Sequence, residues 1–470
     1  MRHTRSAMIA GTAGLALASL VLAGCTTQPP QGTTPPPQGT TQPSESPAPV
    51  VLRVGNMPPE STEGGRKAFE ASVEAFKAEY PHIDIRPEET AFDPQTFSAQ
   101  LAGGTLPTVI EVPFTEMGGL IALDQVKDIT SWVTADPVLS GLSPTALAAV
   151  TDADGTVNGV PILAYTVGLI INRSVFEAAG LDPDTTPLGT WDEVRNAAVT
   201  ITEKTDAAGF GQTTMDNLGG WVLTAMSYSR GERIQSTDTP AVSQLDNPAT
   251  LKSLQWLSDL RWKDDAMGDN FLLGVVDLMQ QTAAGDYGMM VGASDWYNPM
   301  TAAFGMDPAH FGLFPLPQGE GSLGTLGGGT AMIIRPDATD PEVEAALTWI
   351  KWLKLGKYFD KDTAVTDAKA SAEANMPVPN VGLPLVDAAQ HTQYLSWIDE
   401  HINVPFDQMQ AYWDSAETLP IVTEPRVEAQ QIYASLDPLL QKVLTQQDAD
   451  IPASLAEVQA TVSTIVAAAQ

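Results

Sequence analysis

From Val51 onward, short apolar runs alternate with longer segments in which apolar residues recur at helical spacing. The first apolar runs, each typical of a strand, are residues 51–55, 82–87 and 109–112. Between the first two runs, one helical face is formed by Phe69, Val73, Phe76 and Tyr80. A short helix is predicted at residues 97–101. This β-α-β-α-β order predicts a parallel sheet covered by helices on both faces.

A second unit with the same alternation begins near Gly159. Its predicted strands are residues 160–171, 287–291, 311–316 and 330–334. Its helix signals are a capping box at residues 190–193 (Thr-Trp-Asp-Glu), an apolar face within residues 251–262, and Asp340-Pro341 at a helix start. The remaining chain is mostly helical and contains another capping-box pattern at residues 454–457. The pattern predicts an α/β fold with two α/β lobes and a helical C-terminal tail.

The N-terminal segment has the features of a secretory signal peptide: Arg2 and Arg5, then an apolar stretch over residues 7–23. Residues 22–25 (Leu-Ala-Gly-Cys) resemble the bacterial lipoprotein signal, which implies removal of residues 1–24 and diacylation of Cys25. An ordinary cleavage site followed by a buried cysteine is the alternative. It is disfavoured because residues 25–50, rich in Pro, Thr, Gln, Gly and Ser, offer no core and predict a disordered tether.

The composition excludes several classes of protein. A formal net charge of −33 opposes the neutralisation of phosphates on which nucleic-acid binding depends. Cys25 is the single cysteine, so the mature domain is expected to have no disulfide and no thiolate metal site. After the signal, no apolar run is expected to reach the roughly 20 residues of a membrane span. We therefore expect a protein that works in the aqueous space outside the membrane, and not a permease.

The sequence motifs for catalysis and cofactors are weak. Residues 319–324 match G-x-G-x-x-G, but a glycine run and a strand follow, which favours a hairpin over a dinucleotide site. The histidines are scattered, so a zinc site is not expected. Two carboxylates could meet in a cleft and act on a glycoside, but 57 acidic residues make such a pair a weak indicator. No cofactor, metal or enzymatic activity is expected.

Several segments, taken in order, resemble the family-1 extracellular solute-binding proteins, the maltodextrin-binding-like class that serves ABC importers. The segments are residues 154–161 (Asp-Gly-Thr-Val-Asn-Gly-Val-Pro), 170–176 (Ile-Ile-Asn-Arg-Ser-Val-Phe), 190–193, 289–296 (Met-Met-Val-Gly-Ala-Ser-Asp-Trp), 327–333 (Gly-Gly-Gly-Thr-Ala-Met-Ile) and 376–379 (Met-Pro-Val-Pro). Two departures are Arg173, where the family usually has lysine, and Asp295, where small residues are common.

The resemblance implies two lobes that close on a ligand by a hinge motion, with crossings near residues 158–159, 327–329 and 377–384. Lobe 1 would comprise residues 51–158 plus about 329–376, and lobe 2 residues 159–328 plus about 377–470. Sugar rings have apolar C–H faces, so aromatic side chains flanked by polar groups are expected at the ligand. The expected ligand-binding residues are Trp296, Tyr165, Trp221, Asn217, Glu111, Phe114, Asn56, Met57 and Arg426, with Gly328 offering unobstructed backbone N–H groups.

The function expected on these grounds is capture of a mono- or oligosaccharide by a lipid-anchored binding protein, a monomer, which delivers it to separate ABC permease subunits. It would lie on the outer side of the cell membrane. Two alternatives stay open. One is a binding protein for a non-sugar solute (a polyamine, peptide or phosphate ester). The other is a secreted glycan-processing enzyme with paired carboxylates.

Overall fold

The computed structural model describes residues 48–61, 63–94, 96–415 and 418–470. The strands in this part of the chain are β1 (Val50–Val54), β2 (Ile83–Pro87), β3 (Val109–Pro113), β4 (Val160–Asn172), β5 (Ala208–Gly211), β6 (Tyr287–Ala293), β7 (Phe311–Pro315), β8 (Thr325–Ile334) and β9 (Ile421–Val422). The predicted strands of both units are thereby confirmed, with ends that differ by a few residues.

The α-helices before β6 are α1 (Glu63–Glu79), α2 (Phe97–Ala102), α3 (Phe114–Ala122), α4 (Thr130–Ala135), α5 (Pro144–Ala148), α6 (Arg173–Ala178), α7 (Trp191–Lys204), α8 (Leu218–Ser229), α9 (Pro248–Trp262) and α10 (Val275–Ala284). Those after β8 are α11 (Asp340–Ile350), α12 (Gly356–Phe359), α13 (Lys361–Glu373), α14 (Ala388–Ile398), α15 (Gln410–Asp414), α16 (Ala429–Thr445) and α17 (Ile451–Ala468).

The sheet of the first lobe is mixed. β1 pairs in parallel with β2 and β3, as predicted, but β8 lies antiparallel to β3, with Val109 opposite Ile334 and Pro113 opposite Thr330. The parallel arrangement predicted for these three strands is confirmed, and the sheet contains an antiparallel fourth strand that the sequence analysis did not place in it. The reason is topological, because β8 enters this lobe from the second lobe and runs against the direction of β3.

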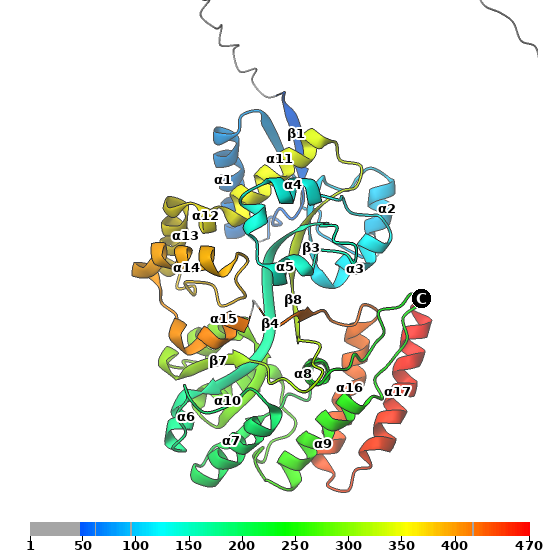
Figure 1. Cartoon of the computed structure of the whole chain (residues 1–470), viewed down its shortest axis with the longest axis vertical. Helices are drawn as coiled ribbons and strands as arrows, with labels where there is room; N and C mark the ends of the chain where they lie inside the picture. Colours follow the sequence, from blue (N-terminus) through cyan, green and yellow to red (C-terminus); the bar gives the residue numbers. More distant parts are fainter. Residues whose placement is uncertain (1–47, 62, 95, 416–417) are drawn as a thin grey trace, which may run out of the picture. The chain divides into compact units, whose positions relative to one another are not determined.

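β4 and β8 connect the two lobes (Figure 1). Residues 160–166 of β4 pair with β8, while residues 167–172 pair with β6 and β7. The change of partner falls between Thr166 and Val167, in the middle of a continuous 13-residue strand. The lobe boundaries expected from the sequence stay a prediction.

Side chains of β4 alternate between two buried apolar clusters. Leu169 and Ile171 belong to one cluster, together with Val194 and Leu254 from the helices on that face. Ile170 belongs to the other, which continues into the core of the first lobe. This alternation follows from the two-residue repeat of a strand that is covered on both faces.

Two of the three sequence-based helix starts are confirmed. Thr190 and Glu193 form the predicted capping box of α7. The helix expected at Asp340-Pro341 is α11, which begins at Asp340, but its cap is Thr339 and not Asp340. The capping box expected at residues 454–457 is wrong, because α17 begins at Ile451. Its cap is Asp450, whose carboxylate accepts the Ala453 N–H at 3.0 Å. Ser454 lies inside the helix, where its hydroxyl donates to the Asp450 carbonyl.

The G-x-G-x-x-G segment is a loop and not the predicted hairpin. It connects β7 to β8, and those strands pair with β4 and not with each other. The Gly319 N–H donates to the Ser229 carbonyl at 2.7 Å, so the loop is held against the end of α8.

Helix α17 differs from a second expectation. Among the described helices it is long and apolar enough, by length and composition, to cross a membrane, although that criterion alone is weak evidence. It packs against α16 and α9 through buried residues such as Leu455 and Val462. The expectation that no apolar segment of this length follows the signal is thus not met.

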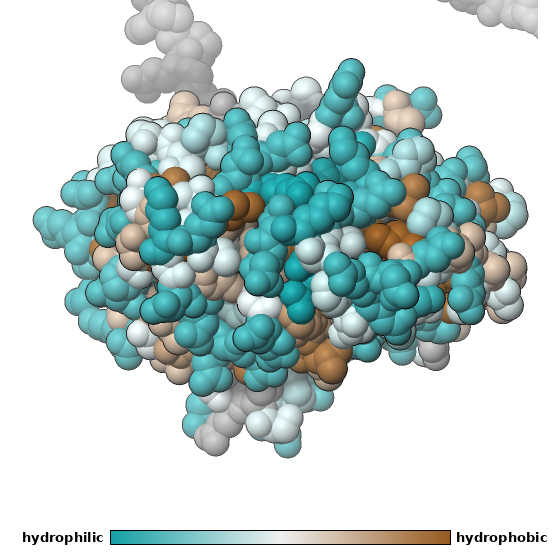
Figure 2. Space-filling view, turned by 90° about the horizontal axis from the view of Figure 1, so that it is seen from below, coloured by the Kyte–Doolittle hydropathy of each residue, from teal (hydrophilic) through white to brown (hydrophobic). Residues whose placement is uncertain are grey.

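The face in Figure 2 is mostly hydrophilic, with separate hydrophobic spots. A hydrophilic surface agrees with the strongly acidic composition.

Candidate ligand-binding site

A cavity of about 500 Å³ lies between the lobes. The first lobe contributes α3, through Phe114, Thr115, Gly118 and Ala122, and the end of α5. These positions share one face of α3, and most of their side chains are small, so the wall is open. The facing wall comes from the end of α8, the loop at residues 233–239, and residues 421–426.

Three of the predicted residues form what we call the aromatic cluster: Tyr165, Trp221 and Trp296. None of them lines the cavity itself, but Glu424, which does, interacts with Trp221 and Tyr165. The rings of Trp221 and Trp296 have centroids 6.1 Å apart and planes inclined by 31°. Trp221 is 9% exposed, while Trp296 is partly buried between the two apolar clusters. Tyr165 stands on β4, close to the change of strand partner.

Two glycines make room for the aromatic cluster. A Cβ atom at Gly292 of β6 would lie 2.4 Å from Cε3 of Trp296. A Cβ atom at Gly328 of β8 would lie 2.7 Å from the Tyr165 hydroxyl. Gly328 was expected to expose its backbone N–H groups to a ligand, but its neighbours indicate a different role. The Tyr165 ring lies against it, and the missing side chain accommodates that ring.

Glu424 links the cavity to the aromatic cluster. It lines the cavity, and its carboxyl group faces the Tyr433 hydroxyl and the Trp221 indole. Burial raises the pKa of Glu424 above its ordinary value, and the contacts with Tyr433 and Trp221 oppose that shift. A carboxyl group in this setting can accept a hydrogen bond when ionised and donate one when protonated.

The same surroundings act on two neighbours. Partial desolvation raises the pKa of Asp295, which precedes Trp296 in the chain and keeps an exposed surface. Burial, followed by the charges of Glu424 and Asp295, raises the pKa of Tyr165 to about 12. The site therefore combines aromatic faces with carboxyl and hydroxyl groups that are partly removed from water.

Two arginines line the cavity at the side of residues 233–239. Arg426 donates to the Asp238 carbonyl at 2.7 Å and to the Thr239 hydroxyl at 3.1 Å. Arg233 lies over the ring of Tyr228, with its guanidinium carbon 5.6 Å from the centroid. The predicted polar residue Arg426 is thus in the cavity wall.

The first turn of α8 is positioned by α16. The Asp437 carboxylate of α16 accepts N–H groups of Asn217 at 2.7 Å and Gly220 at 2.9 Å. Gly220 allows the close approach, since a Cβ atom there would lie 2.5 Å from the Tyr433 backbone. Trp221 follows directly, so this cap orients one side of the aromatic cluster. Asn217 itself is left-handed, at φ 67°, and its amide donates to Gln430 at 3.2 Å.

The other predicted residues of the first lobe have structural partners. Phe114 lines the cavity but is only 2% exposed. Its ring packs against Gly329, where an added Cβ atom would lie 2.6 Å from the ring. The Asn56 side-chain oxygen accepts the Glu111 N–H at 2.8 Å, and the Glu111 carboxylate pairs with Lys354 at 2.9 Å. Met57 is partly buried and its N–H donates to the Glu88 carbonyl. Asn56, Glu111 and Met57 are not among the residues that line the cavity.

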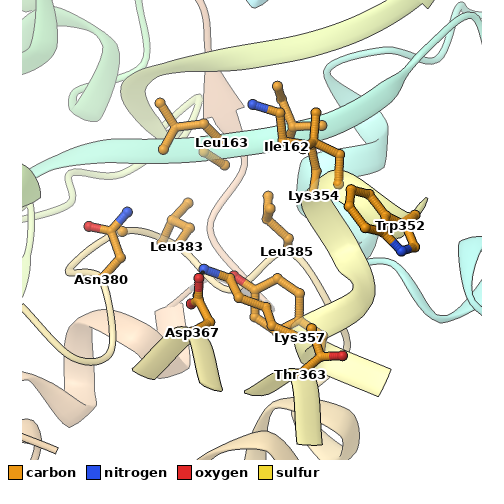
Figure 3. A pocket seen from close by; sticks show the side chains of 14 residues that line it. Ile162, Leu163, Trp352, Lys354, Lys357, Thr363, Asp367, Asn380, Leu383 and Leu385 are labelled. Carbon is orange, nitrogen blue, oxygen red and sulfur yellow. Dashed lines mark hydrogen bonds and ion pairs between the residues drawn. The ribbon is translucent and has the colours of Figure 1, made fainter. Parts of the chain in front are cut away.

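A second, smaller cavity of about 200 Å³ lies against residues 162–164 of β4 (Figure 3). Lys354, the partner of Glu111, is one of its lining residues. Lys357 and Asp367 form an ion pair at 3.2 Å on its wall, and leucine side chains occupy much of the remainder. Its charges are mutually paired, so it is a weaker candidate for binding a solute.

No group of three or more His, Cys, Asp or Glu side chains suitable for a metal ion occurs in the described part of the chain. The sequence analysis did not identify Glu424, Arg233 or Tyr433 as functional. Glu424 stands two residues before Arg426, in Thr-Glu-Pro-Arg. The pairing of Pro425 with Arg426, which drew attention to Arg426, was the nearest sequence feature that could have drawn attention to Glu424.

Cys25 and the predicted signal and tether, up to residue 47, lie outside the described residues.

Comparison with known proteins gives the family. A family model described as "Bacterial extracellular solute-binding protein" matches residues 60–355, which is more than half of the chain. The chain belongs to the bacterial extracellular solute-binding proteins. This is a binding-protein family of the extracellular space, and the two-lobed fold with C-terminal helices agrees with it.

Solved structures of solute-binding proteins are similar over most of the chain. The cyclic alpha-maltosyl-1,6-maltose binding protein of Arthrobacter globiformis is 20% identical, with a TM-score of 0.63, over 89% of this chain and 99% of that one. UspC of M. tuberculosis is 16% identical, with a TM-score of 0.66, over 88% and 100%. MalE of Xanthomonas citri is 17% identical, with a TM-score of 0.64, over 89% and 98%.

Among curated proteins, the solute-binding protein matches the sn-glycerol-3-phosphate-binding periplasmic protein UgpB of Yersinia pseudotuberculosis. The two are 27% identical over 212 residues, which is 42% of this chain and 47% of the relative. The chain thus spans about half the length of the curated relatives it matches.

Proposed function

We propose that this chain is the substrate-binding component of an ABC importer and that its solute is a sugar, either a mono- or an oligosaccharide. The observation that carries the proposal is the aromatic cluster of Tyr165, Trp221 and Trp296, which Glu424 connects to a cavity between two lobes. The apolar C–H face of a sugar ring packs on such rings, while carboxyl and arginine side chains bind its hydroxyl groups.

The names of similar structures support a saccharide. They include a cyclic alpha-maltosyl-1,6-maltose binding protein and a receptor crystallised in complex with acarbose. A phosphate ester is the second candidate. It is favoured by the glycerol-phosphate protein among the curated relatives, although that similarity covers less than half of either protein.

The proposed mechanism involves no chemical conversion of the solute. Lobe 1 (residues 51–158 and about 329–376) and lobe 2 (residues 159–328 and about 377–470) would change their relative orientation about β4 and β8. The solute stabilises the closed arrangement and the permease the arrangement that releases it, so transport shifts a population between the two.

Isothermal titration calorimetry across a panel of mono- and oligosaccharides tests the proposal. We expect at least one saccharide to bind and Trp296→Ala to weaken it by at least tenfold, since the indole face is lost. Trp132→Ala, which removes a partly buried indole from α4 outside the cavity, is the matched control and should leave affinity unchanged. Binding of amines or peptides with no response to any sugar would contradict the saccharide assignment. Release of product from a labelled glycan would contradict the absence of catalysis.

The proposed location is the outer side of the cell membrane, through a diacylated Cys25. Two acyl chains hold a protein on a membrane, whereas one binds marginally. Cys25→Ala should move the protein from the membrane fraction to the medium without changing its affinity for solute, and uptake should fall. Undiminished membrane association of Cys25→Ala would refute the anchor.

A further inference from the structure

The cavity between the lobes is lined by more basic than acidic side chains, although the whole chain is strongly acidic. The chain has a formal net charge of −33. Of the residues that line the cavity, the ionisable ones are Arg233, Arg426 and Glu424, apart from the deeply buried Tyr228. Acidic residues outnumber basic ones by 57 to 24 in the whole chain, but two basic residues and one acid line this cavity. The ratio is therefore reversed at the cavity.

Neither guanidinium is neutralised by a carboxylate. Among the described residues, no ion pair within 4.0 Å involves Arg233 or Arg426, whereas Arg53, Arg66, Arg195 and Arg335 each have acidic partners. Arg426 is held by neutral oxygens, the Asp238 carbonyl and the Thr239 hydroxyl. Arg233 has the Tyr228 ring beneath it. Within the described residues, neither arginine therefore has a carboxylate to saturate its N–H donors.

The two segments that carry the arginines are joined by a pair of hydrogen bonds. Gln235, which is 3% exposed, donates to the Val427 carbonyl at 2.8 Å and accepts the Val427 N–H at 3.0 Å. This two-point contact fixes the segment that carries Arg233 against the segment that carries Arg426. Such rigidity lowers the entropic cost of binding a charged group between them.

The one acid in the wall does not balance the two arginines. Glu424 faces the Trp221 indole and the Tyr433 hydroxyl and forms no ion pair with either arginine, so one carboxylate stands against two guanidinium groups even when it is ionised. Hydroxyl groups of Ser236, Thr237 and Thr239 stand in the same loop and can donate further hydrogen bonds.

We infer that the solute carries an anionic oxygen group, a phosphate or a carboxylate, which binds between Arg233 and Arg426 while its polyhydroxylated body packs on the aromatic cluster. This inference rests on the proposed function and narrows its substrate class. Guanidinium groups suit this role, because they bind planar or tetrahedral oxyanions through paired N–H donors.

Calorimetry with matched pairs of solutes tests the inference. The pairs are glucose with glucose 6-phosphate, glucose with glucuronate, and glycerol with glycerol 3-phosphate, and inorganic phosphate is titrated alone. In at least one pair, we expect the anionic member to bind at least about tenfold more tightly, as charge-assisted hydrogen bonds are the stronger kind. Because part of this preference is electrostatic, it should decrease as salt is raised.

Variants separate the anion site from a general loss of structure. Arg426→Gln and Arg233→Gln should each weaken the anionic member more than the neutral one, with Arg426→Lys retaining part of the preference. Arg86→Gln, at a side chain that is 63% exposed on β2, removes the same charge away from the cavity and should change neither affinity. The melting temperature of each variant shows that it is folded.

The outcomes distinguish this inference from the proposed function. If neutral sugars bind as well as their anionic partners and the arginine variants leave the ratio unchanged, the inference fails and the sugar-binding function stands. If inorganic phosphate binds but no sugar or polyol does, the saccharide assignment fails and the anion site stands. If folded protein binds no member of the panel, both fail.

Discussion

Glu424 shows how the site places a charge in an apolar setting. Its carboxyl group is in contact with Trp221 and Tyr433, and burial raises its pKa above the ordinary value of 4.5. A carboxyl group with a raised pKa in the folded protein stabilises the fold below the unfolded pKa. That contribution is lost as the pH rises through the folded pKa. At neutral pH the ionised group therefore opposes folding.

We accordingly expect Glu424→Gln to be more stable than the natural protein at pH 7, on the order of 1 kcal/mol, because a buried charge is removed. The difference should disappear below about pH 4.5, where the carboxyl group is protonated in both states. Thermal unfolding from pH 4 to pH 8 measures this, with Glu74→Gln as the control at a side chain that is 79% exposed. Equal stability gains at both ends of that pH range would contradict the assignment.

At this scale the sequence identified the aromatic residues but not their polar neighbours. Trp296 closely follows β6 and Tyr165 lies within β4, so both could be named from local pattern. Glu424 and Arg233 lie in irregular segments without periodicity, and their proximity depends on contacts between distant parts of the chain. The Gln235–Val427 contact, for example, joins residues 192 positions apart.

Among the elements, β8 is the one most constrained by its neighbours. A Cβ atom at Gly329 would lie 2.1 Å from the Leu163 carbonyl oxygen of β4 and 2.6 Å from the Phe114 ring. Gly329→Ala should therefore destabilise the protein by about 1–3 kcal/mol through overpacking. Chemical denaturation measures the loss.

The same substitution at Gly64 of α1 is a matched control. A Cβ atom there meets nothing within 4 Å, and alanine is the better helix former, so Gly64→Ala should stabilise by roughly 0.5–1 kcal/mol. If Gly329→Ala proved as harmless as Gly64→Ala, the close contact of β8 with β4 would be wrong.

The start of α8 provides a second prediction for an element. The two carboxylate oxygens of Asp437 accept the N–H groups of Asn217 and Gly220. Asp437→Asn replaces one of these oxygens with an NH2 group, which donates and cannot accept. We expect a loss of about 1–3 kcal/mol, because a buried donor is left without an acceptor. Sugar affinity should also fall, since Trp221 is in the first turn. Asp448→Asn, at an exposed position after α16, is the control and should do neither.

Helix starts show why elements are predicted more easily than their ends. The Thr190 box is isolated and was predicted correctly. Near α17, both Asp450 and Ser454 can cap a helix, and local pattern does not choose between them. The structure selects Asp450, which places Ile451 in the buried face and adds about one turn to the helix.

For the whole molecule, the two-lobed class and the parallel pairing of β1 with β2 and β3 were predictable, and the antiparallel pairing of β8 with β3 was not. Local periodicity shows that residues 330–334 form a strand, but not that they pair with β3, more than 200 positions earlier in the sequence. The order of elements in the first lobe suggested a parallel sheet because the returning strand was not considered.

The proposed closure is a property of the whole molecule. A saturating solute at about 100 times its dissociation constant should raise the free energy of unfolding by roughly 2.7 kcal/mol. Small-angle X-ray scattering should show a smaller radius of gyration in the same sample. A stabilised protein with unchanged scattering would indicate binding without closure.

The pair of indoles at the site has an optical consequence. Trp221 and Trp296 are 6.1 Å apart, close enough for their excited states to couple, and both adjoin a carboxyl group that can quench them. A solute that displaces water from these rings alters their emission and their circular dichroism in the near ultraviolet. The protein therefore contains its own spectroscopic reporter of occupancy, which needs no attached dye, although eight other tryptophans of the ten contribute a background.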